Sequence, residues 1–189
     1  MPEVQIRHGC DISNKLCSRE DIAGSNWWQT ICMPVACILL TWNPLKWSPT
    51  YPEDAAFIRA AEGDRSVLPF IDQWSVGNRN QIDPGTRFFL LRQGTERGLI
   101  ATGSVTSPVH VGPHWDGSRR PSRYVNIKFE EFVASNHRLP TELLIEAIPG
   151  VPWNYIQMSG IELHDHYFSN VAPGNWTALR DLWDNFASK

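Results

Sequence analysis

A continuous apolar run from Val35 to Thr41 constrains the fold of this chain more than any other sequence feature. A strand with one face in water alternates apolar and polar residues. This run does not alternate, so it predicts a central strand buried on both faces. The sequence Trp42-Asn43-Pro44 follows the run and forces a loop, because proline interrupts regular structure. The chain therefore has to build a sheet around this strand.

The rest of the sequence predicts short strands and helices in no regular order. Extended patterns predict strands at 67–74, 87–92, 99–105 and 124–129, the second and third forming a hairpin. Helical patterns fall at 54–61, 140–148 and 176–186, and the apolar stripe of the last is expected to face the core. A polar loop is expected at 106–122 and an irregular segment at 151–160. We therefore expect an α+β fold, with a small curved mixed β-sheet or open barrel and flanking helices.

Length and composition fit one domain with an appended extension. The chain has 189 residues, of which 42% are hydrophobic and 20% charged, as is ordinary for a globular protein. Residues 1–32 show no clear periodicity and are expected to be an N-terminal extension, with the domain at 33–189. No apolar run approaches the roughly 18 residues of a membrane span, and the N-terminus has no secretory signal. A soluble, cytoplasmic protein without membrane contact is expected.

Positive charge is concentrated in the middle of the sequence. The net charge is −3, but the segment from Gly77 to Lys128 holds eight Lys or Arg against three acids. Such polarity is typical of a surface that faces nucleic-acid phosphates, although a solvated strand face has the same composition. The side chains expected to contact the nucleic-acid backbone are Arg79, Arg92, His114, Arg119, Arg120 and Arg123.

The sequence contains no convincing catalytic constellation. His110 and His114 have the spacing of metal ligands on a helix, but Gly112 and Pro113 between them exclude a helix. In His164-Asp165-His166, successive side chains of an extended segment alternate between its two sides, so the three groups are not expected to converge on one site. The four cysteines lack the paired spacing of zinc sites and are expected to be free thiols. We expect no enzyme, no metal and no cofactor. The alternative, an enzyme acting on a nucleotide-like small molecule, has as candidate acids Glu96, Asp116 and Glu162.

Tryptophan recurs beside small polar residues in three segments. Trp42-Asn43, Trp74-Ser75 and Trp153-Asn154 share this context, and nine tryptophans are a strong excess for this length. A flipped base needs aromatic side chains against its faces and amide, hydroxyl and backbone groups at its edge. We predict that the three tryptophans surround one concave site and that Trp74 acts on the base without being needed for the fold; core packing is the alternative. The residues predicted to line this pocket are Trp42, Asn43, Trp74, Ser75, Gly77, Asn78, Gln93, Trp153, Gln157 and Ser159.

A series of segments between Val35 and about Trp183 resembles a known family. The segments are Leu39–Pro44 with Lys46-Trp47, Trp74–Asn78, Phe88–Gly94, Gly98–Gly103, His114–Asp116 and Trp153–Ile161. In their order and spacing the chain resembles the EVE-like N-terminal domain of modification-dependent HNH restriction endonucleases, a relative of PUA and YTH domains. The resemblance implies a PUA/EVE-like fold that reads 5-methylcytosine or 5-hydroxymethylcytosine in DNA by flipping the base into an aromatic cage, within a restriction system.

The chain departs from that family in two respects. The restriction enzymes carry a nuclease domain after the reader, and the residues after Phe186 are too few to hold one; residues 1–32 also have no counterpart. The resemblance therefore implies the reading function alone, with modified DNA and a separate nuclease as expected partners. The sequence leaves open which modified base is bound, whether it belongs to DNA or RNA, the oligomeric state, and whether the chain is a fragment of a nuclease.

Overall fold

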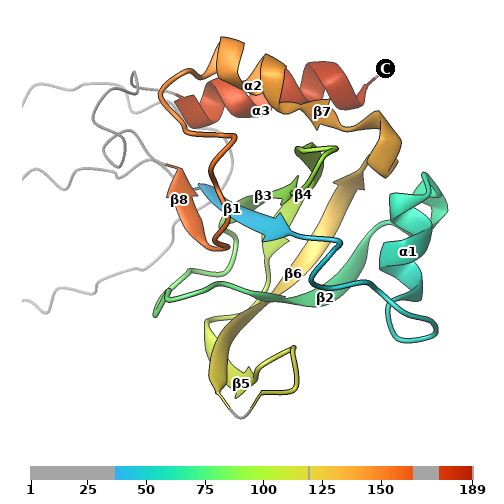
Figure 1. Cartoon of the computed structure of the whole chain (residues 1–189), viewed down its shortest axis with the longest axis vertical. Helices are drawn as coiled ribbons and strands as arrows, with labels where there is room; N and C mark the ends of the chain where they lie inside the picture. Colours follow the sequence, from blue (N-terminus) through green and yellow to red (C-terminus); the bar gives the residue numbers. More distant parts are fainter. Residues whose placement is uncertain (1–36, 119, 164–174, 189) are drawn as a thin grey trace, which may run out of the picture. The chain divides into compact units, whose positions relative to one another are not determined.

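The computed structural model describes residues 37–118, 120–163 and 175–188 (Figure 1). The expected N-terminal extension, Arg119 and the sequence His164-Asp165-His166 lie outside the described residues, as do the first three cysteines. Cys37 is a free thiol, as expected, and its burial raises its pKa to about 12.

The described strands form one open, mixed sheet. They are β1 (Cys37–Trp42), β2 (Phe70–Ser75), β3 (Arg87–Arg92), β4 (Gly98–Val105), β5 (His110–Pro113), β6 (Pro121–Phe132), β7 (Leu139–Pro140) and β8 (Ile161–Leu163). The order is β2-β6-β4-β3-β1-β8, with β5 paired to β6 and β7 to β4. Only the β1–β3 pair is parallel in this part of the chain. The helices are α1 (Ala55–Ala61), α2 (Thr141–Ala147) and α3 (Asn175–Ala187). The fold is α+β, as predicted.

β1 lies inside the sheet, between β3 and β8. Its first four residues, Cys37 to Leu40, are all buried. Successive side chains of a strand point to opposite faces, so neither face of β1 is exposed to solvent over these four residues. This confirms the prediction made from the unbroken apolar run. The predicted hairpin is also confirmed, since β3 and β4 pair antiparallel with Leu90 opposite Ala101.

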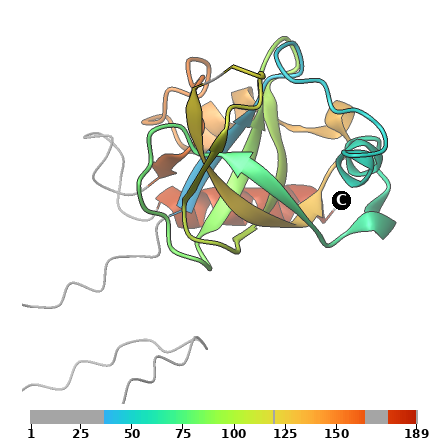
Figure 2. The same ribbon diagram turned by 90° about the horizontal axis from the view of Figure 1, so that it is seen from below.

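Helices complete the core on different sides of the sheet (Figures 1 and 2). Figure 1 shows α2 and α3 side by side at one end of the sheet, with α1 apart from them. Trp183 of α3 is fully buried with its ring 6.1 Å from that of Phe89, and its indole N–H donates to Glu131 at 2.5 Å. Phe57 of α1 lies 5.1 Å from the ring of Trp42. None of the described helices has the length and apolar character needed to cross a membrane.

The segment expected to be a long polar loop contains a strand. β5 pairs antiparallel with the start of β6, with Val111 opposite Arg123 and Gly112 opposite Ser122. The hydroxyl of Tyr124 donates to the backbone oxygen of Pro113 at 2.8 Å and ties the two strands together. The sequence did not predict this pairing, because the segment is polar. The start of β6 extends past the rest of the sheet, and a two-stranded arm formed there does not need a buried apolar face. β5 therefore lacks the apolar pattern by which a strand is predicted. The result is a hairpin arm (Figure 1).

The two outer strands of the sheet path meet near one point because the sheet curls. The N–H of Gly160, just before β8, donates to Leu39, and the Nε of Arg79, just after β2, donates to the backbone oxygen of Gly160 at 2.7 Å. Gly160 has φ +79°, and a Cβ there would lie 2.4 Å from the backbone oxygen of Val76. Glycine is therefore required at this approach. The predicted curved sheet agrees with this arrangement.

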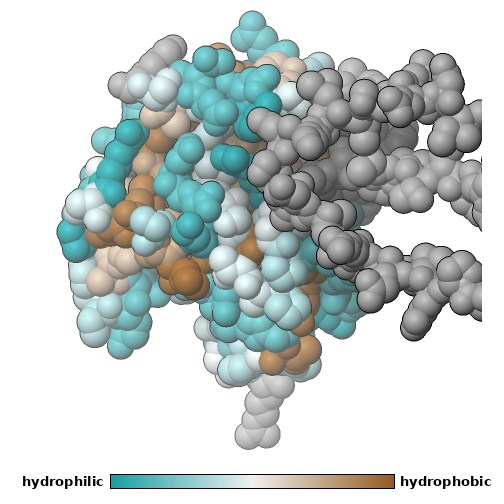
Figure 3. All heavy atoms as spheres, turned by 180° about the vertical axis from the view of Figure 1, so that it is seen from behind, coloured by the Kyte–Doolittle hydropathy of each residue, from teal (hydrophilic) through white to brown (hydrophobic). Residues whose placement is uncertain are grey.

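Exposed apolar side chains are dispersed over several elements. On the face shown in Figure 3, brown apolar groups lie among teal hydrophilic ones where the described residues are visible. Single exposed apolar residues are normal on protein surfaces. The exposed large ones are Leu45, Tyr51, Ile71, Val111, Trp115, Leu143, Ile145, Tyr155 and Met158.

Candidate functional site

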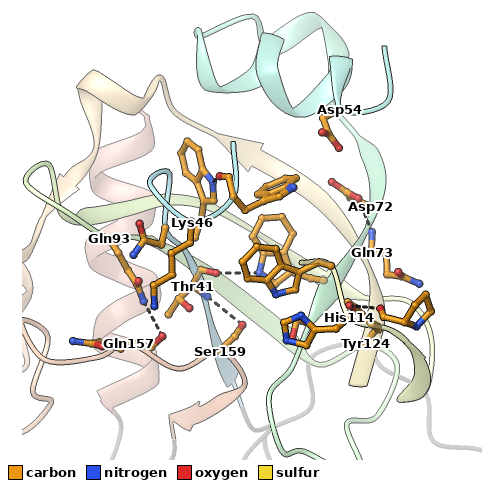
Figure 4. A pocket seen from close by; sticks show the side chains of 17 residues that line it. Thr41, Lys46, Asp54, Asp72, Gln73, Gln93, His114, Tyr124, Gln157 and Ser159 are labelled. Carbon is orange, nitrogen blue, oxygen red and sulfur yellow. Dashed lines mark hydrogen bonds between the residues drawn. The ribbon is translucent and has the colours of Figure 1, made fainter. Parts of the chain in front are cut away.

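A pocket of about 500 Å³ opens at the carboxyl end of β1 (Figure 4). Its walls come from the end of β1 and the following loop, from β2, from the hairpin arm, from Gln93 after β3, and from the segment before β8. Its volume falls within the range of small-molecule sites, about 300–1,000 Å³. The lining residues are Thr41, Trp42, Asn43, Lys46, Trp47, Asp54, Asp72, Gln73, Trp74, Ser75, Gln93, Pro113, His114, Trp115, Tyr124, Gln157 and Ser159.

Tryptophan rings give the pocket flat apolar walls. The indole N–H of Trp42 donates to the backbone oxygen of Trp47 at 3.0 Å, and that of Trp74 donates to the backbone oxygen of Thr41 at 3.3 Å. These polar atoms are already paired within the protein, so the two rings offer a ligand apolar surface. A planar ligand with apolar faces suits such walls.

The tryptophans of the wall differ in how deeply they are packed. Trp74 is only 6% exposed, with its ring stacked on Phe57 at 5.7 Å and Trp47 edge-on to it at 5.5 Å. Trp115, in the turn of the hairpin arm, is 46% exposed and tilted against the His114 ring at 5.4 Å. Trp74 is therefore part of the core as well as of the wall, whereas Trp115 keeps ring surface available for a ligand.

Several predicted polar residues lie at the pocket but are bonded to backbone. Gln93 is buried, and its Nε2 donates to the backbone oxygens of Ile156 at 3.4 Å and Gln157 at 3.0 Å. The hydroxyl of Ser159 accepts the N–H of Thr41 at 3.3 Å. These bonds fasten the segment before β8 to the ends of β1 and β3. Gln93 and Ser159 therefore shape the pocket, while the exposed Gln157 side chain stands at its rim.

The open edge of β2 adds backbone groups to the pocket. Among the described strands β2 pairs with β6 alone, and the bond from the N–H of Val76 to Arg123 fixes which residues face β6. Because backbone groups alternate along an antiparallel strand, those of Gln73 and Ser75 point to the open edge. The N–H of Gln73 is taken by Oδ1 of Asp72 at 2.7 Å. Ser75 therefore offers a ligand both a donor and an acceptor.

Asp72 places a carboxylate on the inner face of the sheet. Its side chain lies on the same face as Phe70 and Trp74, and directly opposite the fully buried Ile127 on β6. Burial raises the pKa of Asp72 above its ordinary value, and the nearby carboxylate of Asp54 acts in the same direction. An acid on an apolar face is costly to ionise.

We expect Asp72→Asn to raise stability at neutral pH. Because the folded-state pKa of Asp72 is raised, the folded protein holds this proton more tightly than the unfolded chain. The carboxylate therefore reduces stability as pH rises above its unfolded pKa of about 3.9. Asparagine has nearly the same size and can still accept the N–H of Gln73. Urea unfolding between pH 4 and pH 7 should show an advantage of the variant that grows with pH. A constant difference across this range, or one also given by the exposed Glu146→Gln variant, contradicts the assignment.

Trp153 does not belong to the pocket, contrary to the sequence prediction. It is 1% exposed, and its indole N–H donates to the backbone oxygen of Ile148 at 3.1 Å, just after α2. Arg97 donates to the backbone oxygen of Trp153 at 2.8 Å and to that of Ile156. The ring is thus a core residue with its polar atom satisfied. A polar sequence context did not make it a ligand residue.

Gly77 and Asn78 are also outside the pocket. The chain turns away after Ser75, and Gly77 has φ +59° in that turn, where a Cβ would come within 2.9 Å of the backbone oxygen of Ser159. Gly77 therefore has a structural reason to be glycine. Asn78 lines a separate polar pocket.

Two of the arginines expected to meet phosphates have partners within the protein. Arg79 pairs with Glu162 at 3.2 Å and lines the separate polar pocket. Arg92 pairs with Glu96 at 2.8 Å and lies 5.9 Å above the ring of Trp42, next to the candidate site without lining it. Both fasten strand ends, which accounts for part of the positive charge in the middle of the sequence.

The remaining basic candidates lie on the hairpin arm. His114 lines the pocket, and its Nδ1 is 2.7 Å from a carboxylate oxygen of Asp116 in the same turn. Arg120 is exposed and Arg123 is half-buried on β6, and neither pairs with an acid among the described residues. Phosphate contact by Arg120 and Arg123 stays a prediction.

Sequence reasoning missed much of the pocket lining. Tyr124 opens the alternating strand after the polar loop and lies opposite His110 across the arm, and Trp115 lies in the turn that follows β5; the pairing of β5 with β6 brings both to the site. Asp72 had a usable signal, an acid in phase with Phe70 and Trp74. The lining residues not predicted are Thr41, Lys46, Trp47, Asp54, Asp72, Gln73, Pro113, Trp115 and Tyr124.

The acids and the histidine of the pocket are not grouped as the ligands of a metal ion are. Within the described part of the chain, no three His, Cys, Asp or Glu residues are grouped so that they could hold an ion. The acids considered for an enzyme, Glu96, Asp116 and Glu162, do not line the pocket, whose own acids are Asp54 and Asp72. Comparison of the chain with protein-family models, with curated proteins and with solved structures gave no match.

Proposed function

We propose that this chain binds DNA that contains a modified cytosine, 5-methylcytosine or 5-hydroxymethylcytosine, and holds the flipped base in the pocket at the carboxyl end of β1. The observation that carries the proposal is one pocket with tryptophan faces on its walls and the open edge of β2 beside them. A nucleobase has two apolar faces and a polar edge, and this pocket offers a match for each.

The aromatic walls also favour a base with an added group. The rings of Trp42 and Trp74 carry no unpaired donor, so a methyl group against them gains apolar contact and leaves no polar atom unmatched. One additional methyl group in an apolar pocket contributes about 1–3 kcal/mol. The pocket thus has a physical means of preferring 5-methylcytosine over cytosine.

Two further features support a reader of the PUA/EVE type. The curled mixed sheet with its flanking helices agrees with that assignment. The hairpin arm carries Arg120 and Arg123 close in sequence to the pocket residues His114 and Trp115. Basic side chains beside a base pocket are suited to the phosphates that flank a flipped nucleotide.

The proposal is tested by duplexes that differ at one cytosine. We expect the full chain to bind duplexes with 5-methylcytosine or 5-hydroxymethylcytosine at least about tenfold more tightly than the unmodified duplex, as measured by fluorescence anisotropy at one salt concentration. A fluorescent base analogue next to the modified site should brighten when the base leaves the stack. Equal affinity for all duplexes rules out the proposal, and tighter binding to a matched RNA strand assigns the pocket to RNA.

A further inference from the structure

Asp72 is an acidic residue at a position of β2 that an apolar residue would be expected to occupy. It lies on the core face of β2 between two aromatic residues, opposite Ile127. Apolar side chains in that position stabilise a sheet, and an ionised carboxylate there is poorly solvated. Its Oδ1 accepts the N–H of Gln73, and Oδ2 has no hydrogen bond to any other described residue. A pocket wall therefore carries an acceptor oxygen that the fold does not use.

The end of the pocket around Asp72 is rich in acceptors. Figure 4 shows Asp54 and Asp72 at one end, with Lys46 towards Gln93 at the other. Oδ2 of Asp54 already accepts the N–H of Thr50 at 2.8 Å. The outward-pointing carbonyl of Gln73 on the open edge of β2 adds another acceptor to the same end. A ligand group placed here is stabilised when it donates hydrogen bonds.

We propose that Asp72 accepts a hydrogen bond from the exocyclic amino group of the bound base, so that the pocket takes amino-bearing bases and rejects their oxo counterparts. This inference rests on the proposed function, because it assumes that a base enters the pocket. An ionised carboxylate has only acceptor atoms. An amino group at C4 of cytosine completes its bonding. A carbonyl at the same place brings two acceptors together, and both then lose their water without gaining a partner.

Discrimination of this kind is strong in proteins. A site built around a buried polar group rejects the analogue that lacks the matching partner more severely than an apolar pocket rejects a missing methyl group. Asp72 therefore complements the aromatic walls. The walls favour a base with a methyl group, and the carboxylate distinguishes an amino group from a carbonyl on the edge of the base.

An inward-pointing charge on an outer strand can also have a purely structural role, which is the alternative explanation for Asp72. It can prevent the open edge of β2 from pairing with another chain. This role predicts self-association when the charge is removed and no change in base preference. The two roles of Asp72 therefore differ in what they predict for the same variant.

The test uses single-stranded oligonucleotides that differ only at one base, because single strands have no pairing energy to lose. One pair compares 5-methylcytosine with thymine, which differ only in the amino or oxo group at C4 and the proton at N3. A second pair compares cytosine with uracil. We expect the wild-type protein to prefer the amino member of each pair by at least about tenfold. We expect Asp72→Asn to bring both ratios to one or below, since its amide oxygen still accepts the N–H of Gln73 and its NH2 group, in place of Oδ2, can donate to a carbonyl but cannot accept from an amino group.

The control variant is Glu146→Gln, which removes the same charge from an exposed position on α2 and should keep both ratios. Unchanged ratios in Asp72→Asn overturn the inference. If that variant also self-associates, Asp72 instead prevents the open edge of β2 from pairing with another chain. Equal wild-type binding to both members of each pair also overturns it. The proposed preference for modified cytosine is judged separately by the duplex comparison, so either statement can fail while the other holds.

Discussion

Replacing Trp115 with alanine is expected to weaken binding of modified DNA by about tenfold to a hundredfold while leaving the melting temperature nearly unchanged. Stacking of a base on an aromatic side chain contributes about 1–3 kcal/mol, which corresponds to that range of affinity. Trp115 is 46% exposed, and its ring lies against that of His114 in its own turn, so we expect the fold to lose little when the ring is removed. Anisotropy titration and thermal melting of the same sample measure both effects.

Two companion variants make the Trp115 prediction specific. Trp115→Phe keeps a ring and should retain most of the affinity. Tyr155→Ala removes an 83% exposed aromatic ring that does not line the pocket and should bind as the wild type does. If Trp115→Ala binds normally, the ring is not a stacking platform. A large fall in melting temperature instead shows that the hairpin arm depends on it.

Trp74→Ala is expected to lower the free energy of unfolding by about 3–5 kcal/mol, the usual cost of truncating a large buried aromatic residue. Its ring stacks on Phe57 and meets Trp47 and Phe129 edge-on, and its N–H is bonded to Thr41. For a domain of this size, such a loss lowers the melting temperature by roughly 6–20 °C. This corrects the expectation from sequence that Trp74 can be removed without harm to the fold.

The effect of Trp74 on binding has to be measured below the melting point of the variant. There the loss of the wall should also reduce base discrimination, because Trp74 belongs to both core and pocket. Trp74→Phe, which keeps a ring stacked on Phe57, should recover much of the stability. An unchanged melting temperature in Trp74→Ala would show that the ring is not packed as the structure has it.

The sequence by itself determined most of the local elements. The unbroken apolar run defined β1, the glycine-containing link defined the hairpin of β3 and β4, and the apolar stripe around Trp183 defined α3 as a core helix. These signals are local, because the spacing of the apolar residues within a strand or helix indicates which of its faces are buried. The α+β class followed from the irregular order of these elements.

Only the tertiary structure decided which residues share a site. Trp42, Trp74 and Trp153 have similar sequence contexts, yet the first two line the pocket and the third is buried beyond α2. Sequence context reports the chemistry next to a residue, whereas the neighbours of its ring are set by pairings between distant strands. The pairing of β5 with β6 brings Trp115 to the pocket. The register of β2 against β6 places the Asp72 side chain on the inner face of the sheet. Long-range register assembles the pocket, and local sequence patterns do not specify that register.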